Sequence, residues 1–277
     1  MDNRFGKTLL AITTYNQLKY TKYCVDSIEK LNEVPFDLMI IDDCSTDGTV
    51  EWCKKNNIEV VDKHKPMGLT HSWNMAYKYF KDNKEYEYII ISNNDVLIPK
   101  EAISELLKVV NRWHFSVVVP TSTVYGAGHT EMYQGVENIY KSLSKELPKE
   151  LLIDPNNFQT IQDQILNIKR EAIKDNNICG LDPRRIKLFN GFFFLMTRKV
   201  IEYENEDNTL FDSTKPIYKA EDEFNWSKLI PRDDFAAVCR TSFIYHFKGI
   251  STENFSLENN TIDSFQQKRK EIDKING

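Results

Sequence analysis

Between residues 7 and 120, short apolar runs alternate with segments of helical spacing, and this alternation restricts the chain to few folds. Buried strands are predicted from the apolar runs at residues 7–13, 36–41, 58–61, 86–92 and 115–120. Helices are predicted between them at residues 20–31, 49–56, 69–80 and 100–113. Strands and helices in this order form right-handed βαβ units. The sequence therefore predicts an α/β fold, with a mostly parallel sheet flanked by helices.

The pattern weakens after residue 120. Helical spacing returns at residues 137–150 and 158–175, residues 188–196 are strongly apolar, and residues 236–247 contain another predicted strand. Shorter helices are predicted at residues 198–203 and 221–229, and the tail from residue 256 reads as a polar, exposed helix. We find no internal repeat.

Charge and cysteine content exclude several classes of protein. The 277 residues carry a net charge of −5, which argues against a broad nucleic-acid surface because such surfaces must neutralise phosphates. The five cysteines include no C-x-x-C pair, so neither a disulfide framework nor a zinc site is expected. The sequence lacks a signal peptide's apolar core and any run long enough to span a membrane. We therefore expect a soluble, cytoplasmic protein.

Polar residues follow three of the predicted strands at the point where each strand ends. These groups are Thr13-Thr14-Tyr15-Asn16, Asp42-Asp43 and Ser92-Asn93-Asn94-Asp95. Asp-rich turns also follow strands for local reasons, so each group alone is weak evidence for a site. In a parallel sheet, however, the three ends share one edge, where ligands bind. The convergence is therefore more specific than any of its members.

These groups resemble motifs of the inverting GT-A glycosyltransferases of family two. The order and spacing are similar for Thr13-Thr14-Tyr15-Asn16, Asp42-Asp43-x-Ser45-x-Asp47-Gly48-Thr49, Gly68-Leu69 with Asn74, and Asn93-Asn94-Asp95-Val96 with Pro99. The second half resembles the rhamnosyltransferase-like branch in Asn190-Gly191-Phe192-Phe193-Phe194-Leu195, Phe211-Asp212, Glu221-Asp222-Glu223-Phe224 and His246-x-x-Gly249-x-Ser251. The resemblance covers roughly residues 7–251, apart from a poorly matched middle.

The resemblance implies that a nucleotide sugar binds at the strand ends. Asp43 would accept a hydrogen bond from the base or ribose, and the same donor site would include Thr13, Thr14, Tyr15, Gly68, Asn74, Asn93 and Asn94. A divalent metal, Mn²⁺ or Mg²⁺, would bind Asp95 and His246 and stabilise the leaving diphosphate. The sequence departs from the family here, since Asn93 and Asn94 replace the usual acidic partner of Asp95. A buried structural histidine is the alternative for His246.

Asp222 matches the catalytic base of the family. An inverting transfer needs a carboxylate to take the proton of the acceptor hydroxyl. An acidic helix start is the competing interpretation, because carboxylates favour helix N-termini. Lys63-His64-Lys65 is predicted to be a solvated loop, which could also reach the diphosphate. Trp73 is predicted to pack in the core from one face of a helix.

The resemblance implies a GT-A, Rossmann-like catalytic domain over residues 1–251 and a helical tail over residues 252–277. Within the domain, residues 7–120 would bind the nucleotide sugar, residues 121–187 would form a helical insert, and residues 188–251 would serve the acceptor and catalysis. We expect transfer of one sugar from a UDP- or dTDP-sugar, with rhamnose as one candidate, to a saccharide or lipid-linked saccharide. The alternatives are a non-catalytic sugar- or nucleotide-binding module and a nucleotidyltransferase; the second lacks a Gly-rich, basic phosphate loop after the first strand.

Overall fold

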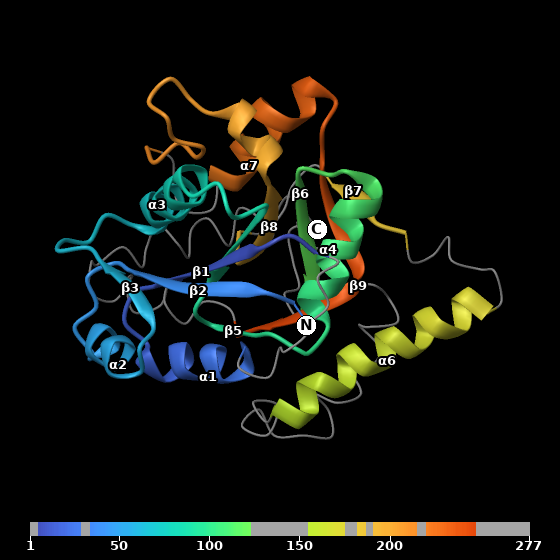
Figure 1. Ribbon diagram of the computed structural model, residues 1–277, viewed down its shortest axis with the longest axis horizontal. Helices are drawn as coiled ribbons and strands as arrows, with labels where there is room; N and C mark the ends of the chain where they lie inside the picture. The colour runs from blue at the N-terminus through green and yellow to red at the C-terminus, as the bar shows by residue number, and fades with distance from the viewer. Residues whose placement is uncertain are drawn as a thin grey trace, which may run out of the picture.

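The fold is built on a nine-stranded sheet whose order is β3-β2-β1-β4-β8-β6-β9-β5, with β7 paired to β9 (Figure 1). The computed structural model describes residues 5–28, 34–122, 155–174, 182–186, 191–214 and 220–247. The strands are β1 (Thr8–Thr14), β2 (Phe36–Asp42), β3 (Glu59–Asp62), β4 (Tyr88–Asn93), β5 (Val96–Leu97), β6 (Val117–Ser122), β7 (Arg184–Ile186), β8 (Phe193–Thr197) and β9 (Ala236–His246).

Six of the nine strands described in this sheet run in one direction, although four of the eight strand pairs are antiparallel. Strands β3, β2, β1 and β4 run in one direction, and β9 runs parallel to β6. Strand β8 is antiparallel to both of its neighbours, β4 and β6. The short strands β5 and β7 both pair antiparallel with β9. The predicted α/β fold with a mostly parallel sheet is confirmed.

Helices cover both faces of the sheet, because alternate residues of the buried strands face opposite sides. Leu10 and Ile12 of β1 pack in the cluster that includes α1 (Leu18–Ile28), α2 (Thr49–Lys55) and α4 (Ala102–Trp113). Leu9 and Ala11 face the opposite cluster, with α3 (Leu69–Asp82), the 3-10 helix η3 (Arg198–Tyr203) and α7 (Ala220–Phe224). Figure 1 shows α3 and α1 on opposite sides of β1 and β2.

The elements predicted before residue 120 all occur, with ends that differ by a few residues. The predicted helix at 158–175 is α6 (Pro155–Lys174), and the one at 221–229 is α7 followed by a π-helical turn, η4 (Asn225–Leu229). Another short 3-10 turn, η5 (Ile230–Arg232), leads into β9. Strands β5 and β7 were not predicted. The predicted helix at 137–150 and the tail from residue 256 lie outside the described residues.

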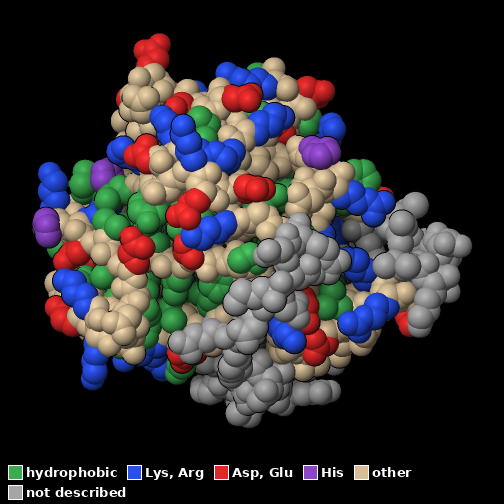
Figure 2. Space-filling view, in the orientation of Figure 1, with side chains coloured by type: hydrophobic (Ala, Val, Ile, Leu, Met, Phe, Trp, Pro, Cys, Tyr) green, Lys and Arg blue, Asp and Glu red, His purple; other side chains and the backbone are tan. Residues whose placement is uncertain are grey.

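Charged side chains of both signs are interspersed on the face of the molecule in Figure 2. Within the described part of the chain, no helix combines the length and the apolar character needed to cross a membrane.

Helix α6 is attached to the sheet through Gln162, which forms hydrogen bonds with the backbone of β9 where that strand is irregular. The β6–β9 register shifts between Pro120 and Thr121, so the backbone of β9 around Thr241 leaves the regular ladder. Gln162 is fully buried; its Nε2 donates to the Thr241 carbonyl at 2.9 Å, and its Oε1 accepts the Phe243 N–H at 2.8 Å. The side-chain amide thus takes the place of a neighbouring strand.

Replacing Gln162 with Leu is expected to destabilise the fold strongly. A buried carbonyl and a buried N–H would both lose their partner, which costs about 2–4 kcal/mol in total. Urea unfolding measures the loss in the free energy of unfolding. Gln164→Leu is the matched control, because Gln164 is exposed on the same helix and its replacement should change stability by less than ~0.5 kcal/mol. Equal effects of the two substitutions would contradict this account.

Candidate functional site

The carboxyl ends of β1, β2, β3 and β4 lie side by side at one edge of the sheet. Thr14 ends β1 and pairs with Asp42, which ends β2, and Asp42 pairs in turn with Asp62 at the end of β3. On the other side of β1, Thr13 pairs with Asn93, which ends β4. The sheet therefore brings the three polar strand ends together, as its parallel order predicts.

Asp43 is the most constrained side chain at this edge. It is 8% exposed, and its two oxygens accept the N–H groups of Met67 and Gly68 at 2.7 and 2.8 Å. The Lys63 ammonium lies 2.6 Å from Oδ1 and also donates to the Ser72 hydroxyl at 2.8 Å. A carboxylate has about four acceptor positions, and three are used here. Asp43 can therefore still accept one hydrogen bond from a ligand.

The prediction that Lys63 belongs to a solvated loop is wrong. It is 5% exposed, whereas His64 and Lys65 are exposed. The reason is its place directly after β3, whose last residue pairs with Asp42 and so brings Lys63 beside Asp43. The charges of residues 63–65 do not indicate that Lys63 is buried. The position of Lys63 one residue beyond a strand end does.

Gly68 begins α3 in a backbone conformation with φ of 87°, which side chains with a Cβ rarely adopt. A Cβ there would meet nothing within 4 Å, so the requirement for glycine is conformational. The turn points the N–H groups of Met67 and Gly68 at Asp43. Gly68 thus shapes the loop around the carboxylate.

A pocket of about 350 Å³ opens beside Asp43, between the end of β3 and α3. It is lined by Asp62, Lys63, His64, Lys65, Met67, His71 and Met75. Burial and the nearby Lys63 charge lower the pKa of His71, so its imidazole is neutral at pH 7. Its buried Nδ1 has no hydrogen-bond partner among the described residues. The pocket offers basic, thioether and imidazole groups to a flat or anionic ligand.

Thr13, Thr14 and Asn94 are bound within the protein at the end of β1. Thr13 donates to the Ser92 carbonyl at 3.2 Å. The Asn94 amide nitrogen donates to the hydroxyls of Thr14 and Thr21, both at 3.0 Å. These three site candidates therefore join β1, β4 and α1, while Tyr15 lies partly buried just beyond them.

Asp95 and His246 lie together across the β5–β9 pairing. Asp95 Oδ1 is 3.2 Å from His246 Nε2, and the two side chains are 4% and 7% exposed. The His246 ring stacks on Phe192 with centroids 4.5 Å apart. Asn93 Oδ1 and Asp95 Oδ1 are buried and accept no hydrogen bond from the described residues. Two oxygen atoms and an imidazole thus gather at the end of β4.

The group at the end of β4 is small for a metal site made by protein alone. Among the described residues, no three His, Cys, Asp or Glu side chains are grouped to hold a metal ion. Mg²⁺ is often bound by one or two carboxylates, with substrate phosphates completing the shell. The residues present fit that mode, because buried oxygens without donors are suited to a cation.

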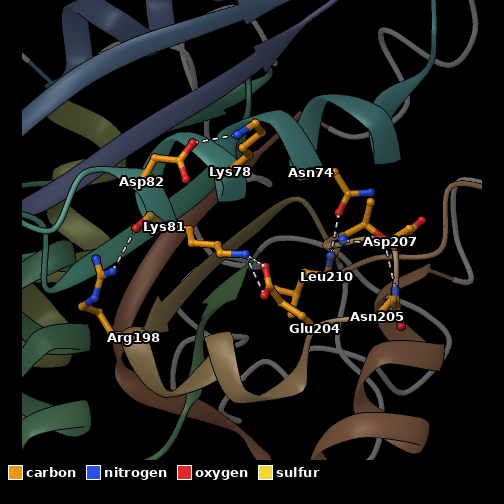
Figure 3. A network of polar contacts seen from close by, with 10 residues as sticks. Asn74, Lys78, Lys81, Asp82, Arg198, Glu204, Asn205, Asp207 and Leu210 are labelled. Atoms are coloured by element: carbon orange, nitrogen blue, oxygen red, sulfur yellow. Dashed lines mark hydrogen bonds and ion pairs between the residues drawn. The ribbon is translucent and has the colours of Figure 1, made fainter.

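Asn74 has its polar atoms engaged away from the strand ends. Its Oδ1 accepts the N–H groups of Leu210 and Phe211 at 3.1 and 2.9 Å, and its Nδ2 donates to the Phe211 carbonyl at 2.7 Å. Figure 3 shows Asn74 on α3 turned toward Leu210, near the Lys81–Glu204 ion pair. This geometry gives Asn74 a structural role, because it joins α3 to Leu210 and Phe211.

Asp222 lies in α7, in the layer of helices that contains α3. The preceding Glu221 is 6% exposed and accepts the N–H of Gly191 at 3.2 Å. Trp73, predicted to be a core residue, is 1% exposed and packs edge-on against Phe194 and Phe211. The contact of Glu221 has no signal in the sequence, because Gly191 lies 30 positions away along the chain.

This constellation can be compared with known proteins. The model of the family described as "Glycosyl transferase family 2" matches residues 10–174 of the chain. The chain belongs to glycosyl transferase family 2. The match includes the ends of β1, β2 and β4, so the strand-end residues described above lie within the family's own region.

The curated relatives that the chain matches are longer proteins, and the match covers only part of each. The poly(ribitol-phosphate) beta-N-acetylglucosaminyltransferase TarS of Staphylococcus aureus is 26% identical over 247 residues, which is 84% of this chain and 39% of TarS. The low-salt glycan biosynthesis hexosyltransferase Agl10 of Haloferax volcanii is 26% identical over 30% of this chain and 27% of its own. The chain thus spans about two fifths of TarS.

Solved structures show the same fold. The structure of S. aureus TarS 1–349 has a TM-score of 0.54 at 16% identity, covering 88% of this chain and 61% of its own. The mannosyltransferase PcManGT of Pyrobaculum calidifontis, in complex with GDP-Man and Mn²⁺, has a TM-score of 0.54 at 13% identity, covering 88% and 57%. The GT-A architecture is therefore shown.

Lys63→Met should destabilise the protein, because it leaves the buried Asp43 carboxylate without its cation. Loss of one partner of a buried pair is expected to lower the free energy of unfolding by about 3 kcal/mol. Chemical denaturation measures the difference. Lys65→Met, at an exposed position two residues away, is the control and should be nearly neutral. If both variants unfold at the wild-type denaturant concentration, the buried ion pair contributes nothing.

Proposed function

We propose that the chain is an inverting glycosyltransferase that moves one sugar from a pyrimidine nucleoside diphosphate sugar to an acceptor hydroxyl. The observation that carries the proposal is the shared edge of β1, β2 and β4, where Asp43 is fixed by Lys63 and Asn93 lies in register with Thr13. Membership of glycosyl transferase family 2 supports this chemistry. A TarS structure in complex with UDP-GlcNAc, with a TM-score of 0.53, supports the donor class.

In this proposal the nucleoside binds beside Asp43. The fourth acceptor position of the carboxylate takes an N–H of the base or a ribose hydroxyl. The neighbouring pocket, with neutral His71 and the two methionines, receives the flat ring. The base of the proposed nucleoside site is formed by Thr13, Thr14 and Asn94, whose hydrogen bonds keep β1 and β4 in register. Tyr15 lies at the entrance of this site.

The diphosphate lies at the end of β4 in this proposal. Asp95 and His246, with Asn93 Oδ1, would hold a divalent ion, Mn²⁺ or Mg²⁺, which supplies positive charge against the leaving diphosphate when bound. The buried setting of these groups excludes water and strengthens their electrostatic effect. The Mn²⁺ complex of PcManGT supports the choice of ion.

Asp222 is the proposed base. It takes the proton of the acceptor hydroxyl while the oxygen forms a bond to the anomeric carbon and the bond to the diphosphate breaks. Attack from the face opposite the diphosphate inverts the configuration. We assign donor binding to residues 7–120 and acceptor binding to residues 188–251, and propose a saccharide or lipid-linked saccharide acceptor and a sugar such as GlcNAc or rhamnose. The free thiols of Cys24, Cys44, Cys53 and Cys239 suit a cytoplasmic location.

Asp222→Asn is expected to lower kcat by roughly 10²–10⁴ because the base is lost. Release of nucleoside diphosphate from a panel of nucleotide sugars measures turnover, and calorimetry with UDP measures donor-site binding. UDP affinity should be unchanged, since the donor is bound at the strand ends. Turnover at the wild-type rate would refute the role of Asp222, and UDP binding without transfer from any donor would favour a binding module.

Asp95→Asn tests the metal site separately from turnover. The variant should weaken the Mn²⁺-dependent part of UDP binding by about a hundredfold, the larger end of losses seen around metal sites. Calorimetry with Mn²⁺ and with EDTA separates this part from direct binding, which should not change. Affinity that is equal with Mn²⁺ and with EDTA in the wild-type protein would rule the metal out.

A further inference from the structure

We infer that Glu221 is a positioning residue that fixes the helix of Asp222 against the metal end of the donor site. The inference rests on the proposed role of Asp222 and adds a residue to it. Glu221 is 6% exposed, and its Oε1 accepts the Gly191 N–H at 3.2 Å. Gly191 is joined directly to Phe192, which contacts two residues of the proposed metal site, Asn93 and His246.

Phe192 connects this bond to the donor side in two ways. Its carbonyl accepts the N–H of Asn93 at 2.8 Å, which holds the end of β4. Its ring stacks on that of His246, with centroids 4.5 Å apart and planes inclined by 12°. The Gly191-Phe192 segment therefore contacts Asn93, His246 and Glu221 at the same time.

Gly191 has no room for a side chain. A Cβ at this position would lie 2.4 Å from Trp73 Cη2 and 3.1 Å from Glu221 Oε1. Trp73 is itself fixed, because it is buried on α3 between Phe194 and Phe211. The backbone N–H thus has a defined position to which the carboxylate reaches.

A second contact holds the other end of α7. The rings of Phe224 and Phe211 lie 5.2 Å apart. Asn74 makes two hydrogen bonds with the backbone of Phe211 and one with that of Leu210. Asp222 lies between the two anchored residues, Glu221 and Phe224. The backbone that carries the proposed base is therefore held from α3 and from the segment before β8.

The energetic argument favours a positional role for the carboxylate. Burying an acidic group costs free energy unless hydrogen bonds compensate for its lost hydration, so a glutamate is an unfavourable residue for merely filling space in the core. A glutamate side chain has the reach to accept the Gly191 N–H, whereas an aspartate is one methylene shorter. A base displaced by about 1 Å can lose about a hundredfold in rate.

Two substitutions separate hydrogen bonding from charge. Glu221→Gln keeps the length and an acceptor oxygen, and its kcat should stay within about threefold of wild type. Glu221→Asp keeps the charge but loses the reach, and its kcat should fall about a hundredfold, with the KM for the donor unchanged. Glu223→Asp makes the same change two residues along α7 and should have no effect on kcat.

Hydrogen exchange of residues 220–229 with UDP bound gives a readout that does not depend on turnover. Exchange should be faster in Glu221→Asp and close to wild type in Glu221→Gln, with β1 and β4 unchanged in both. The inference is overturned if exchange in this segment is unaffected by Glu221→Asp, or if the glutamine variant behaves worse than the aspartate variant, since charge would then be what matters. Absence of transfer by the wild-type protein would instead refute the proposed function, while the exchange result would still decide whether Glu221 holds α7.

Discussion

The arrangement of the site depends on the interactions of one buried carboxylate, that of Asp43. Its oxygens bind two successive N–H groups of the loop before α3 and the ammonium of Lys63, at distances from 2.6 to 2.8 Å. These contacts fasten the start of α3 to the end of β2. Because α3 also carries Trp73 and Asn74, which contact Gly191, Leu210 and Phe211, the way this loop is held also affects the placement of these three residues.

Polar residues at the sheet edge have two different uses. Asp42 accepts the Ser45 N–H at 2.7 Å, Asp47 accepts the Leu18 N–H at 2.7 Å, and Asn94 binds two threonines. These side chains satisfy backbone and hydroxyl groups that the turns would otherwise leave unpaired, which is a structural need. Asn93, Asp95 and Asp42 itself each also keep one buried oxygen that accepts no hydrogen bond from the described residues. In the proposed function, Asn93 and Asp95 use these oxygens to hold a divalent ion, whereas Asp42 serves the turn that follows β2.

The sequence predicted the first half of the fold well because buried parallel strands are continuous apolar runs, such as residues 88–91, and need no partner to be recognised. It also predicted that the polar strand ends meet, since this follows from parallel order alone. It could not predict contacts between distant residues. Asn74 binds residues 136 and 137 positions away, and Lys63 is buried by a carboxylate on the neighbouring strand. Strands β5 and β7 are two and three residues long, too short to carry a pattern.

In the proposed transfer reaction, the donor and the proposed base must be held at a fixed distance, although they belong to parts of the chain more than a hundred residues apart. Because a long stretch of chain connects these two parts, the connection by itself does not give their relative placement its accuracy. The structure supplies it through the segment at the start of β8, which is inserted antiparallel between β4 and β6 and so lies beside the end of β4. Gly191 and Phe192 at this point touch both the β4 end and α7. Because β8 is antiparallel, it starts at the carboxyl edge of the sheet beside the end of β4, and Gly191 there contacts the helix that carries the proposed base, Asp222.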